Sequence, residues 1–175
     1  MKTYRLTTAG FTLIETLMAI LVLTVAIAGP LTIASRGLNE ALVAKDQTIA
    51  FYLAQDAVEF VRYQRDTNVL QSNAWLTGLD SCEAADGCTV LSISDTIGAC
   101  SGICPVLNYD KSLSVYTYNS IGGTVIPTIF TRTVHITTPV SGSAVEAQVE
   151  VDVTWSDVGT VLHKVSVQEN LFNWQ

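Results

Sequence analysis

One uninterrupted apolar stretch constrains this chain more than any other feature of its sequence. No charged residue occurs in residues 16–35, which is a run of twenty positions, and Arg36 is the first charge after it. About twenty apolar residues are enough for a helix to cross the hydrocarbon core of a bilayer. The sequence therefore predicts a single membrane-spanning helix over residues 11–36, close to the N-terminus.

A single carboxylate, Glu15, stands at the start of this apolar stretch. A carboxylate at the edge of hydrocarbon is unfavourable unless it is paired or reaches water. Glu15 ends the segment Gly10-Phe11-Thr12-Leu13-Ile14-Glu15. This segment, together with the apolar helix behind it, resembles the N-terminal signature of type IV prepilins and of the pseudopilins of related secretion and DNA-uptake machines. The resemblance rests on a glycine before a phenylalanine, a glutamate at this spacing and the long hydrophobic run.

The resemblance implies a processing site and an assembly site. In that family a prepilin peptidase cuts after the glycine and methylates the new N-terminal amine, so residues 1–10 are expected to be a leader, Gly10 to precede the cut and Phe11 to be the methylated N-terminus. Glu15 is expected to meet the N-terminal ammonium of a neighbouring subunit, because pairing offsets the desolvation of both charges. The partners implied are other pilin subunits, the prepilin peptidase/methyltransferase, the membrane assembly platform and, before assembly, the lipid bilayer.

Two other interpretations of the N-terminus remain open. Thr12 and Glu15 have the spacing of a capping box, in which the glutamate satisfies a free backbone N–H at a helix start. The small residues around Ala26 and Ala28 fit a signal-peptidase site after an apolar region. Cleavage there would release a secreted binding protein, and an uncleaved segment would anchor one at the surface.

The net charge and its distribution limit the possible functions and the location of the rest of the protein. The chain has 175 residues and a formal charge of −7, and removing Lys2 and Arg5 with the leader leaves 7 basic against 16 acidic residues, or −9. This excess of acid argues against a basic nucleic-acid-binding surface. The basic leader predicts that its side of the membrane is cytoplasmic and that everything after Arg36 lies outside the cytoplasm. We expect a single-pass inner-membrane protein that later becomes part of an extracellular filament.

The helix is expected to continue well beyond the membrane segment. Gly29 and Pro30 predict a bend or a local loosening, because proline removes a backbone donor and clashes with the preceding turn. Residues 37–67 are predicted to form the outer, amphipathic half of the helix. Their apolar residues recur at helical spacing and form one stripe: Ile49, Ala50, Leu53, Ala54, Ala57, Val58 and Val61.

Residues 68–112 lose this periodicity and hold all four cysteines. We interpret the segment as a connecting loop. An even number of cysteines outside the cytoplasm favours disulfides, and we prefer the local pairs Cys82–Cys88 and Cys100–Cys104. A four-thiolate zinc site is the alternative, although neither spacing is a C-x2-C knuckle. Acidic residues in the same loop also make calcium conceivable, without matching an EF-hand.

Residues 113–175 are predicted to form an antiparallel β head. Apolar and polar residues alternate clearly in 145–155, and the apolar parity returns in 161–167 after a turn at 156–159. With 113–118 and 128–138, this gives an α+β fold with about four strands packed on the outer half of the helix. The valine-rich strand ending in Trp155, the short turn and the strand running to Trp174 resemble the type IV pilus modification group of minor pilins.

No enzymatic function is predicted. The chain has only two histidines, and it contains no phosphate-binding glycine loop, no G-x-S-x-G and no H-E-x-x-H. No cofactor and no metal ligand set is expected. The sequence indicates a structural subunit, a minor pilin of a type IV pilus-like filament, with a pseudopilin of a type II secretion or DNA-uptake machine as the alternative.

Overall fold

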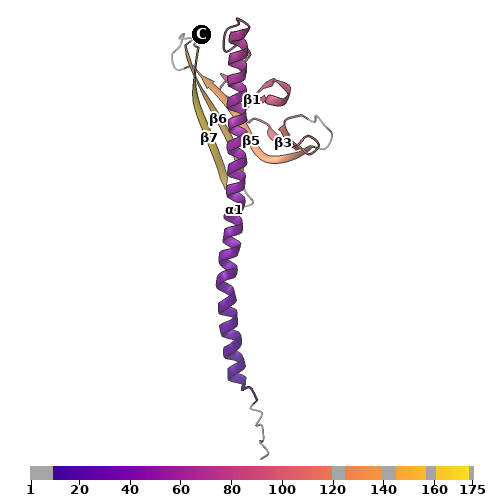
Figure 1. Ribbon diagram of the computed structural model, residues 1–175, viewed down its shortest axis with the longest axis vertical. Coiled ribbons are helices and arrows are strands. Elements are labelled where there is room, and N and C mark those ends of the chain that lie inside the picture. Colours follow the sequence, from indigo (N-terminus) through magenta and orange to yellow (C-terminus); the bar gives the residue numbers. More distant parts are fainter. Residues whose placement is uncertain (1–9, 120–124, 139–144, 157–160, 174–175) are drawn as a thin grey trace, which may run out of the picture. The chain divides into compact units, whose positions relative to one another are not determined.

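The computed structural model describes residues 10–119, 125–138, 145–156 and 161–173, so that most of the expected leader lies outside the described residues. The chain divides into two compact units, of which the first ends at Ala44 and the second begins at Lys45. Helix α1 (Leu13–Leu70) has 58 residues (Figure 1). The long helix predicted from the sequence is confirmed, with a start two residues later and an end three residues later than expected.

The second unit contains one antiparallel sheet of seven strands. Two hairpins come first and three longer strands follow: β1 (Cys88–Leu91), β2 (Thr96–Ala99), β3 (Val106–Asp110), β4 (Val115–Thr117), β5 (Val125–Thr137), β6 (Glu146–Ser156) and β7 (Leu162–Phe172). Short 3-10 turns lie before β1 (η1, Asp80–Cys82) and between β1 and β2 (η2, Ser92–Ser94).

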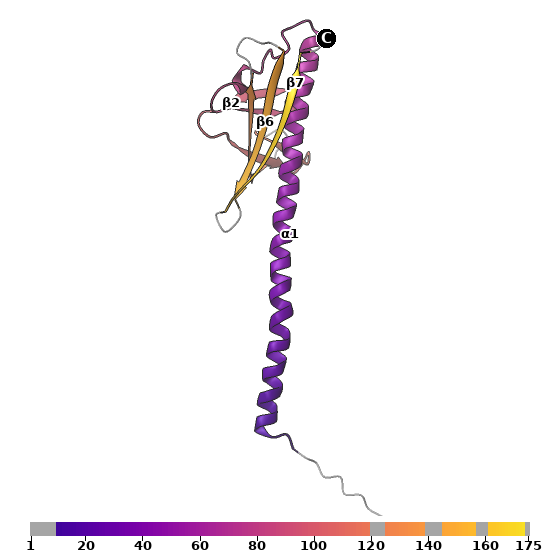
Figure 2. The ribbon, with the colours of Figure 1, turned by 90° about the vertical axis from the view of Figure 1, so that its left-hand side faces the viewer.

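Strand β5 is the centre of the sheet. One of its edges pairs with β6, which pairs in turn with β7 over its whole length. Its other edge is shared, because β3 pairs with its first half from Val125 to Thr131 and β1 pairs with its second half at Val134. Figure 2 shows β6 and β7 side by side along the part of α1 that belongs to this unit. The two hairpins therefore meet the same strand end to end.

The expected strand count of about four was wrong. Strands β4 to β7 correspond to the four predicted strands, whereas β1, β2 and β3 lie in the segment 68–112 that we interpreted as a connecting loop. These three strands have only four or five residues each, and all four residues of β1 are buried. Four or five residues are too few to display a period, and a strand buried on both faces, like β1, has no apolar–polar alternation, so periodicity could not reveal these strands. The predicted turn at 156–159 lies almost entirely outside the described residues.

The core lies between the sheet and the second part of α1. The predicted helix stripe is confirmed, since its members from Ala50 onward are buried and Ile49 packs at their edge. The inward residues of β6, from Ala147 to Trp155, form the opposite wall. Ala50, Ala54 and Ala57 have no exposed surface, and such short side chains allow a helix to approach its neighbour closely.

A buried amide holds the chain where it leaves the helix. The side-chain amide of Asn68 donates to the carbonyl oxygens of Trp75, at 3.1 Å, and Thr77, at 2.8 Å. Trp75 and Leu79 are buried in the core and anchor this segment to the head. The segment after α1 is therefore packed against the domain rather than free in solvent.

Candidate functional site

The residues of the predicted processing site stand just before the helix. Gly10 and Phe11 precede α1 and are exposed. Thr12 caps the helix, because its carbonyl oxygen accepts from the backbone N–H groups of Glu15, at 3.1 Å, and Thr16, at 3.2 Å. The Thr12 hydroxyl also accepts from the Glu15 N–H at 3.4 Å. The peptide bond after Gly10 therefore lies outside the hydrogen-bonded helix.

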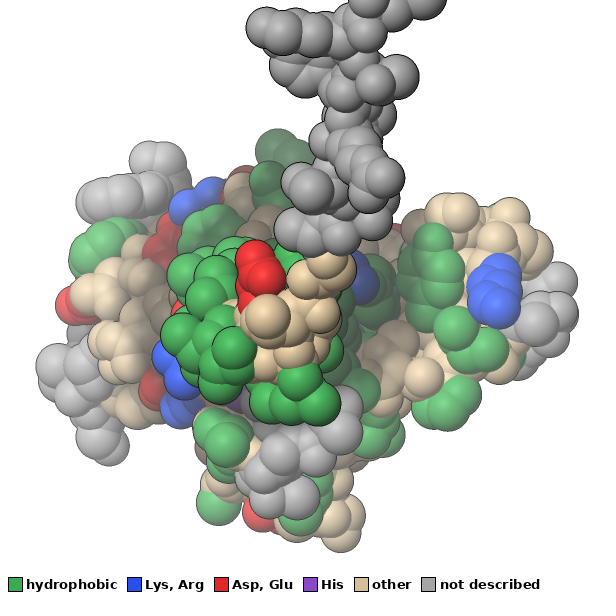
Figure 3. Space-filling view, turned by 90° about the horizontal axis from the view of Figure 1, so that it is seen from below, with side chains coloured by type: hydrophobic (Ala, Val, Ile, Leu, Met, Phe, Trp, Pro, Cys, Tyr) green, Lys and Arg blue, Asp and Glu red, His purple; other side chains and the backbone are tan. Residues whose placement is uncertain are grey.

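Only one half of the capping box is present. The reciprocal bond, from the Thr12 N–H to the Glu15 carboxylate, is not found among the described residues, and in that part of the chain the Glu15 carboxylate makes no hydrogen bond or ion pair. Glu15 is the acidic residue in the first turn of α1. Figure 3 shows hydrophobic side chains gathered around the near end of the helix, with one acidic side chain among them. No described residue of the chain forms an ion pair with the Glu15 carboxylate.

The first part of α1 has no cover from its own chain. All described residues from 10 to 42 are exposed. They include large apolar side chains such as Phe11, 79% exposed, Leu23, 62% exposed, and Ile33, 73% exposed. The helix is long and apolar enough to cross a membrane, and none of its most apolar window is buried inside the protein. Each such side chain gains about 1.5–3 kcal/mol on leaving water, so this surface favours an apolar surrounding.

The hydroxyl groups of three threonines in this segment form hydrogen bonds with backbone carbonyls of the same helix. Thr16, Thr24 and Thr32 donate to the backbone carbonyls of Leu13, Leu21 and Ala28, each at 2.8 Å. Within hydrocarbon no water is available for such groups, so internal bonding allows their burial. The Glu15 carboxylate, in contrast, has no such bond within the helix and needs a partner from outside it.

The helix continues through the predicted break. Gly29 and Pro30 lie inside α1, and the helical assignment has no gap there. Because Pro30 has no N–H, the carbonyl of Ala26 lacks its usual donor four residues ahead. The expected loosening of this turn stays a prediction.

The four cysteines form the two expected disulfides. Cys82 pairs with Cys88, and Cys100 pairs with Cys104. The prediction of local pairing is thereby confirmed, and the four-thiolate zinc alternative is excluded because the sulfurs are bonded to each other. Among the described residues no group of three His, Cys, Asp or Glu is placed to hold a metal ion. The disulfides brace the stretch around β1 and β2.

A buried arginine joins the parts of the head. Arg132 of β5 is 1% exposed. Its Nη1 donates to the carbonyl of Leu53 and to Asp56 Oδ2, both at 2.8 Å, and its Nη2 donates to the carbonyl of Val90. The Tyr118 hydroxyl donates to the backbone carbonyl of Arg132 at 3.3 Å. The Arg132 side chain thus links β5 to α1 and β1, and its backbone carbonyl holds the tyrosine that follows β4.

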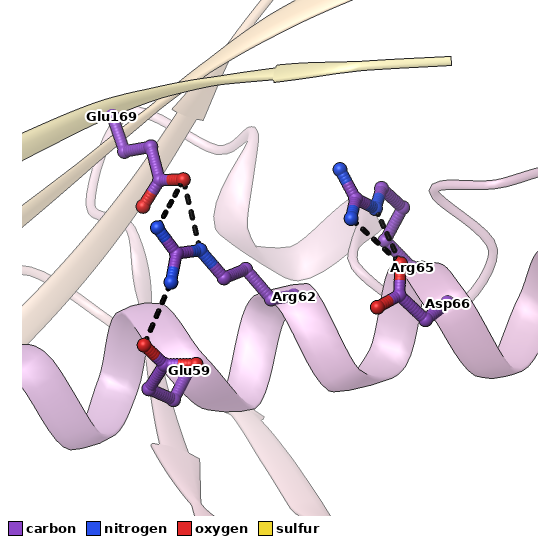
Figure 4. A network of polar contacts seen from close by, with 5 residues as sticks. All are labelled: Glu59, Arg62, Arg65, Asp66 and Glu169. Carbon is purple, nitrogen blue, oxygen red and sulfur yellow. Dashed lines mark hydrogen bonds and ion pairs between the residues drawn. The ribbon is translucent and has the colours of Figure 1, made fainter. Parts of the chain in front are cut away.

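A second ion pair ties α1 to the edge strand β7. Arg62 donates from Nε and Nη2 to Glu169 Oε1 at 2.8 and 2.6 Å, and from Nη1 to Glu59 at 2.7 Å (Figure 4). The hydrogen bond with Glu169 is the main cause that raises the pKa of Arg62. The neighbouring pair of Arg65 and Asp66 lies within the helix surface itself.

An apolar groove runs beside α1 on the head. Its volume is about 390 Å³, and the helix, the η2 turn and β4 line it with Ile49, Tyr52, Leu53, Asp56, Leu91, Ser92, Ile93, Val115 and Tyr116. Burial, followed by the nearby Tyr109 and Asp46, raises the pKa of Tyr116, so its phenol stays neutral. Asp56, the acid in the groove, is already engaged by Arg132 and by the Ser92 hydroxyl at 2.8 Å. The groove is therefore apolar and locally neutral.

The groove opens into an acidic hollow farther along the helix. Phe60 and Tyr63 line this hollow together with the carboxylates of Glu59 and Asp95, and it shares Asp56 and Ser92 with the apolar groove. The two hollows form one surface that changes from apolar to acidic along α1.

Sequence reasoning missed the head groove and Arg132. Arg132 occupies the inward parity of its strand between Phe130 and Val134, and a charge in that position was the available signal of a buried ion pair. Periodicity alone also does not reveal which aromatic residues of the helix are exposed. Phe51, Tyr52 and Tyr63 would ordinarily be expected to pack in a core, yet each is more than half exposed, whereas Phe60 is buried.

No family model, no curated protein and no solved structure matches the chain. The functional interpretation therefore depends on the residues and contacts described above.

Proposed function

We propose that this protein is a type IV pilin-like subunit, of the minor pilin kind, that is held in the inner membrane by the first part of α1 and then assembled into an extracellular filament through that same segment. A prepilin peptidase cuts after Gly10 and methylates Phe11. The head lies outside the cytoplasm, and the protein acts as a structural component rather than as an enzyme.

One observation carries this proposal. A helical segment that is exposed over residues 10–42 is apolar throughout residues 16–35, and its one carboxylate, Glu15, has no partner among the described residues. A plain membrane anchor has no need of an acid at this position, and such an acid is unfavourable in hydrocarbon. An assembling subunit does need it, because a neighbouring N-terminal ammonium then neutralises it.

The position of the proposed cut fits this role. Gly10 and Phe11 lie outside the helix, in backbone that a protease can engage. Cleavage places the new ammonium of Phe11 four residues before Glu15. Both charges lose hydration on entering a bundle of apolar helices, and each desolvation is costly by several kcal/mol, so their pairing fixes axial register more than it adds net stability.

Substitution of Glu15 tests the proposal. Glu15→Ala should leave cleavage intact and should remove the protein from sheared filaments, because the variant cannot neutralise the neighbouring ammonium. Glu40→Ala, an exposed glutamate farther along the same helix, is the matched control and should be incorporated at the level of the unmodified chain. Equal incorporation of both variants would contradict the proposed role of Glu15.

A further inference from the structure

The groove on the head combines features that indicate a defined occupant. It is apolar beside Ile49 and Tyr52 and becomes acidic toward Glu59 and Tyr63. Tyr52 is 65% exposed and Ile93 is 48% exposed, so the apolar part presents large side chains to solvent. A surface of this kind fits an amphipathic helix laid into a groove.

We propose that this groove receives residues 31–45 of a second copy of this chain, packed parallel to α1. The inference rests on the proposed function and adds to it that two copies of this chain are neighbours in the filament. It adds a contact between the head of one copy and the helix of the next, separate from the contact at Glu15.

The spacing of the incoming segment matches the groove. Leu31, Leu38 and Leu42 are 67%, 69% and 58% exposed. With Lys45 they recur seven, four and three positions apart, which places all four side chains on one face of a helix. Fourteen positions separate Leu31 from Lys45, and fourteen separate the groove residues Ile49 and Tyr63. Both spans are about 21 Å of helix.

The charges of the two surfaces are complementary. Four basic residues of the head are already paired with acids, namely Arg62, Arg65, Arg132 and Lys164. Lys45 forms no ion pair with any described residue. It follows the leucine stripe directly, and the acidic hollow directly follows the apolar groove. Complementary charges of this kind fix the register of an interface.

The match also fixes the direction of packing. When Leu31 lies against Ile49 and Tyr52, Lys45 reaches the carboxylates of Glu59 and Asp95 only if the two helices are parallel. Two copies inserted into one membrane by the same N-terminal segment have this common direction. An antiparallel arrangement would place Lys45 at the apolar end.

Photo-crosslinking in cells that assemble the protein tests the contact. A full-length chain carrying p-benzoylphenylalanine at position 52 is co-produced with a differently tagged unmodified copy, then irradiated and digested for mass spectrometry. Phe51 is the matched control, because it is the adjacent aromatic residue, is 51% exposed and does not line the groove. We expect a product containing both tags, with the probe at position 52 joined to residues 31–45, and a lower yield from position 51.

Charge variants sharpen the test. Lys45→Glu should lower the crosslink yield about two- to fivefold, as expected for one exposed ion pair, and Lys45→Arg should preserve it. Crosslinks from position 52 only to lipid, to another protein or to other segments of the second copy would overturn the inference, as would equal yields from positions 51 and 52. Any of these results with filaments still formed would leave the proposed function standing. Equal incorporation of Glu15→Ala and Glu40→Ala into filaments would count against the proposed function and is read separately from the crosslinks.

Discussion

Helix α1 contains two stretches of similar length, of which the first is exposed along its whole length and the second packs one face against the sheet. In residues 13–42 every side chain is exposed, and apolar residues occur on all sides of the helix. In residues 45–70 one stripe of apolar residues is buried against the sheet, whereas Phe51, Tyr52 and Tyr63 lie off that stripe and are exposed. A helix that is hydrophobic all round needs an apolar surrounding on every side, whereas an amphipathic helix needs one packed face.

The comparison separates folding from assembly. The second stretch contributes to the stability of the head, because its burial occurs within the chain. The first stretch contributes to that stability little or nothing, and its apolar surface is available to a membrane and then to other subunits. Substitutions of the same type should therefore have different effects in the two stretches.

The largest loss of head stability is expected at Arg132, which joins the second stretch to the sheet. Arg132→Ala leaves two carbonyls without their donor and removes the partner of Asp56, so the free energy of unfolding should fall by about 3–5 kcal/mol. Lys164→Ala is the control, since its pair with Asp152 involves a half-exposed lysine, and should change stability by about 0.2–1 kcal/mol. Denaturant unfolding of the full chain in detergent, followed by fluorescence of the buried Trp75 and Trp155, measures both. Similar values for the two variants would contradict the linking role of Arg132.

A matched pair of leucines tests the comparison directly. Leu53 is buried in the second stretch and Leu21 is exposed in the first. Leu53→Ala should reduce the free energy of unfolding of the head by about 2–5 kcal/mol, whereas Leu21→Ala should change it by less than about 0.5 kcal/mol. The same unfolding experiment gives both values. A comparable loss at Leu21 would mean that the first stretch packs against its own head.

The disulfides should stabilise the head alone. Removing the Cys82–Cys88 bridge by a double substitution to alanine should reduce stability by about 2–4 kcal/mol, since both cysteines are buried. Removing Cys100–Cys104, which closes a shorter loop, should reduce it by about 2 kcal/mol. Membrane association, measured by carbonate extraction, should be unchanged in both variants. Release from the membrane would show that the head, rather than the first stretch, holds the protein there.

The smallest effect is expected from Tyr118 at high pH. Burial raises the pKa of the Tyr118 hydroxyl, and the charge of Arg132 opposes this shift only in part. The folded state therefore retains this proton more strongly than the unfolded state. The resulting stability is fully present below the ordinary tyrosine pKa of about 10 and is lost as pH rises above it. Tyr118→Phe should make the decline of stability above that pH shallower, and an identical decline in both proteins would refute the assignment.

The sequence predicted those parts of the molecule whose patterns extend over many residues. The helix, its buried stripe and the inward valines of β6 all repeat often enough to reveal their period. Local disulfide pairing also followed from cysteine spacing. The same reasoning failed for β1, β2 and β3, because four or five residues do not display a period.

Other features depend on contacts between distant segments. The groove is built by α1, the η2 turn and β4, which no local pattern brings together. Gly87 is a further example, since its φ of +69° and the approach of the Val134 carbonyl, 2.8 Å from where a Cβ would stand, become evident only in the fold. Such positions are decided by tertiary packing, which local periodicity does not record.

The N-terminus of the mature protein tests the central claim most directly. The intact mass and N-terminal peptide should be determined for protein purified from cells with an active prepilin peptidase. A start at Phe11 bearing one methyl group is the predicted result, because it creates the ammonium that Glu15 is proposed to meet. A start at Gly29, which indicates signal-peptidase cleavage, or an intact Met1, which indicates a plain membrane anchor, would contradict the account.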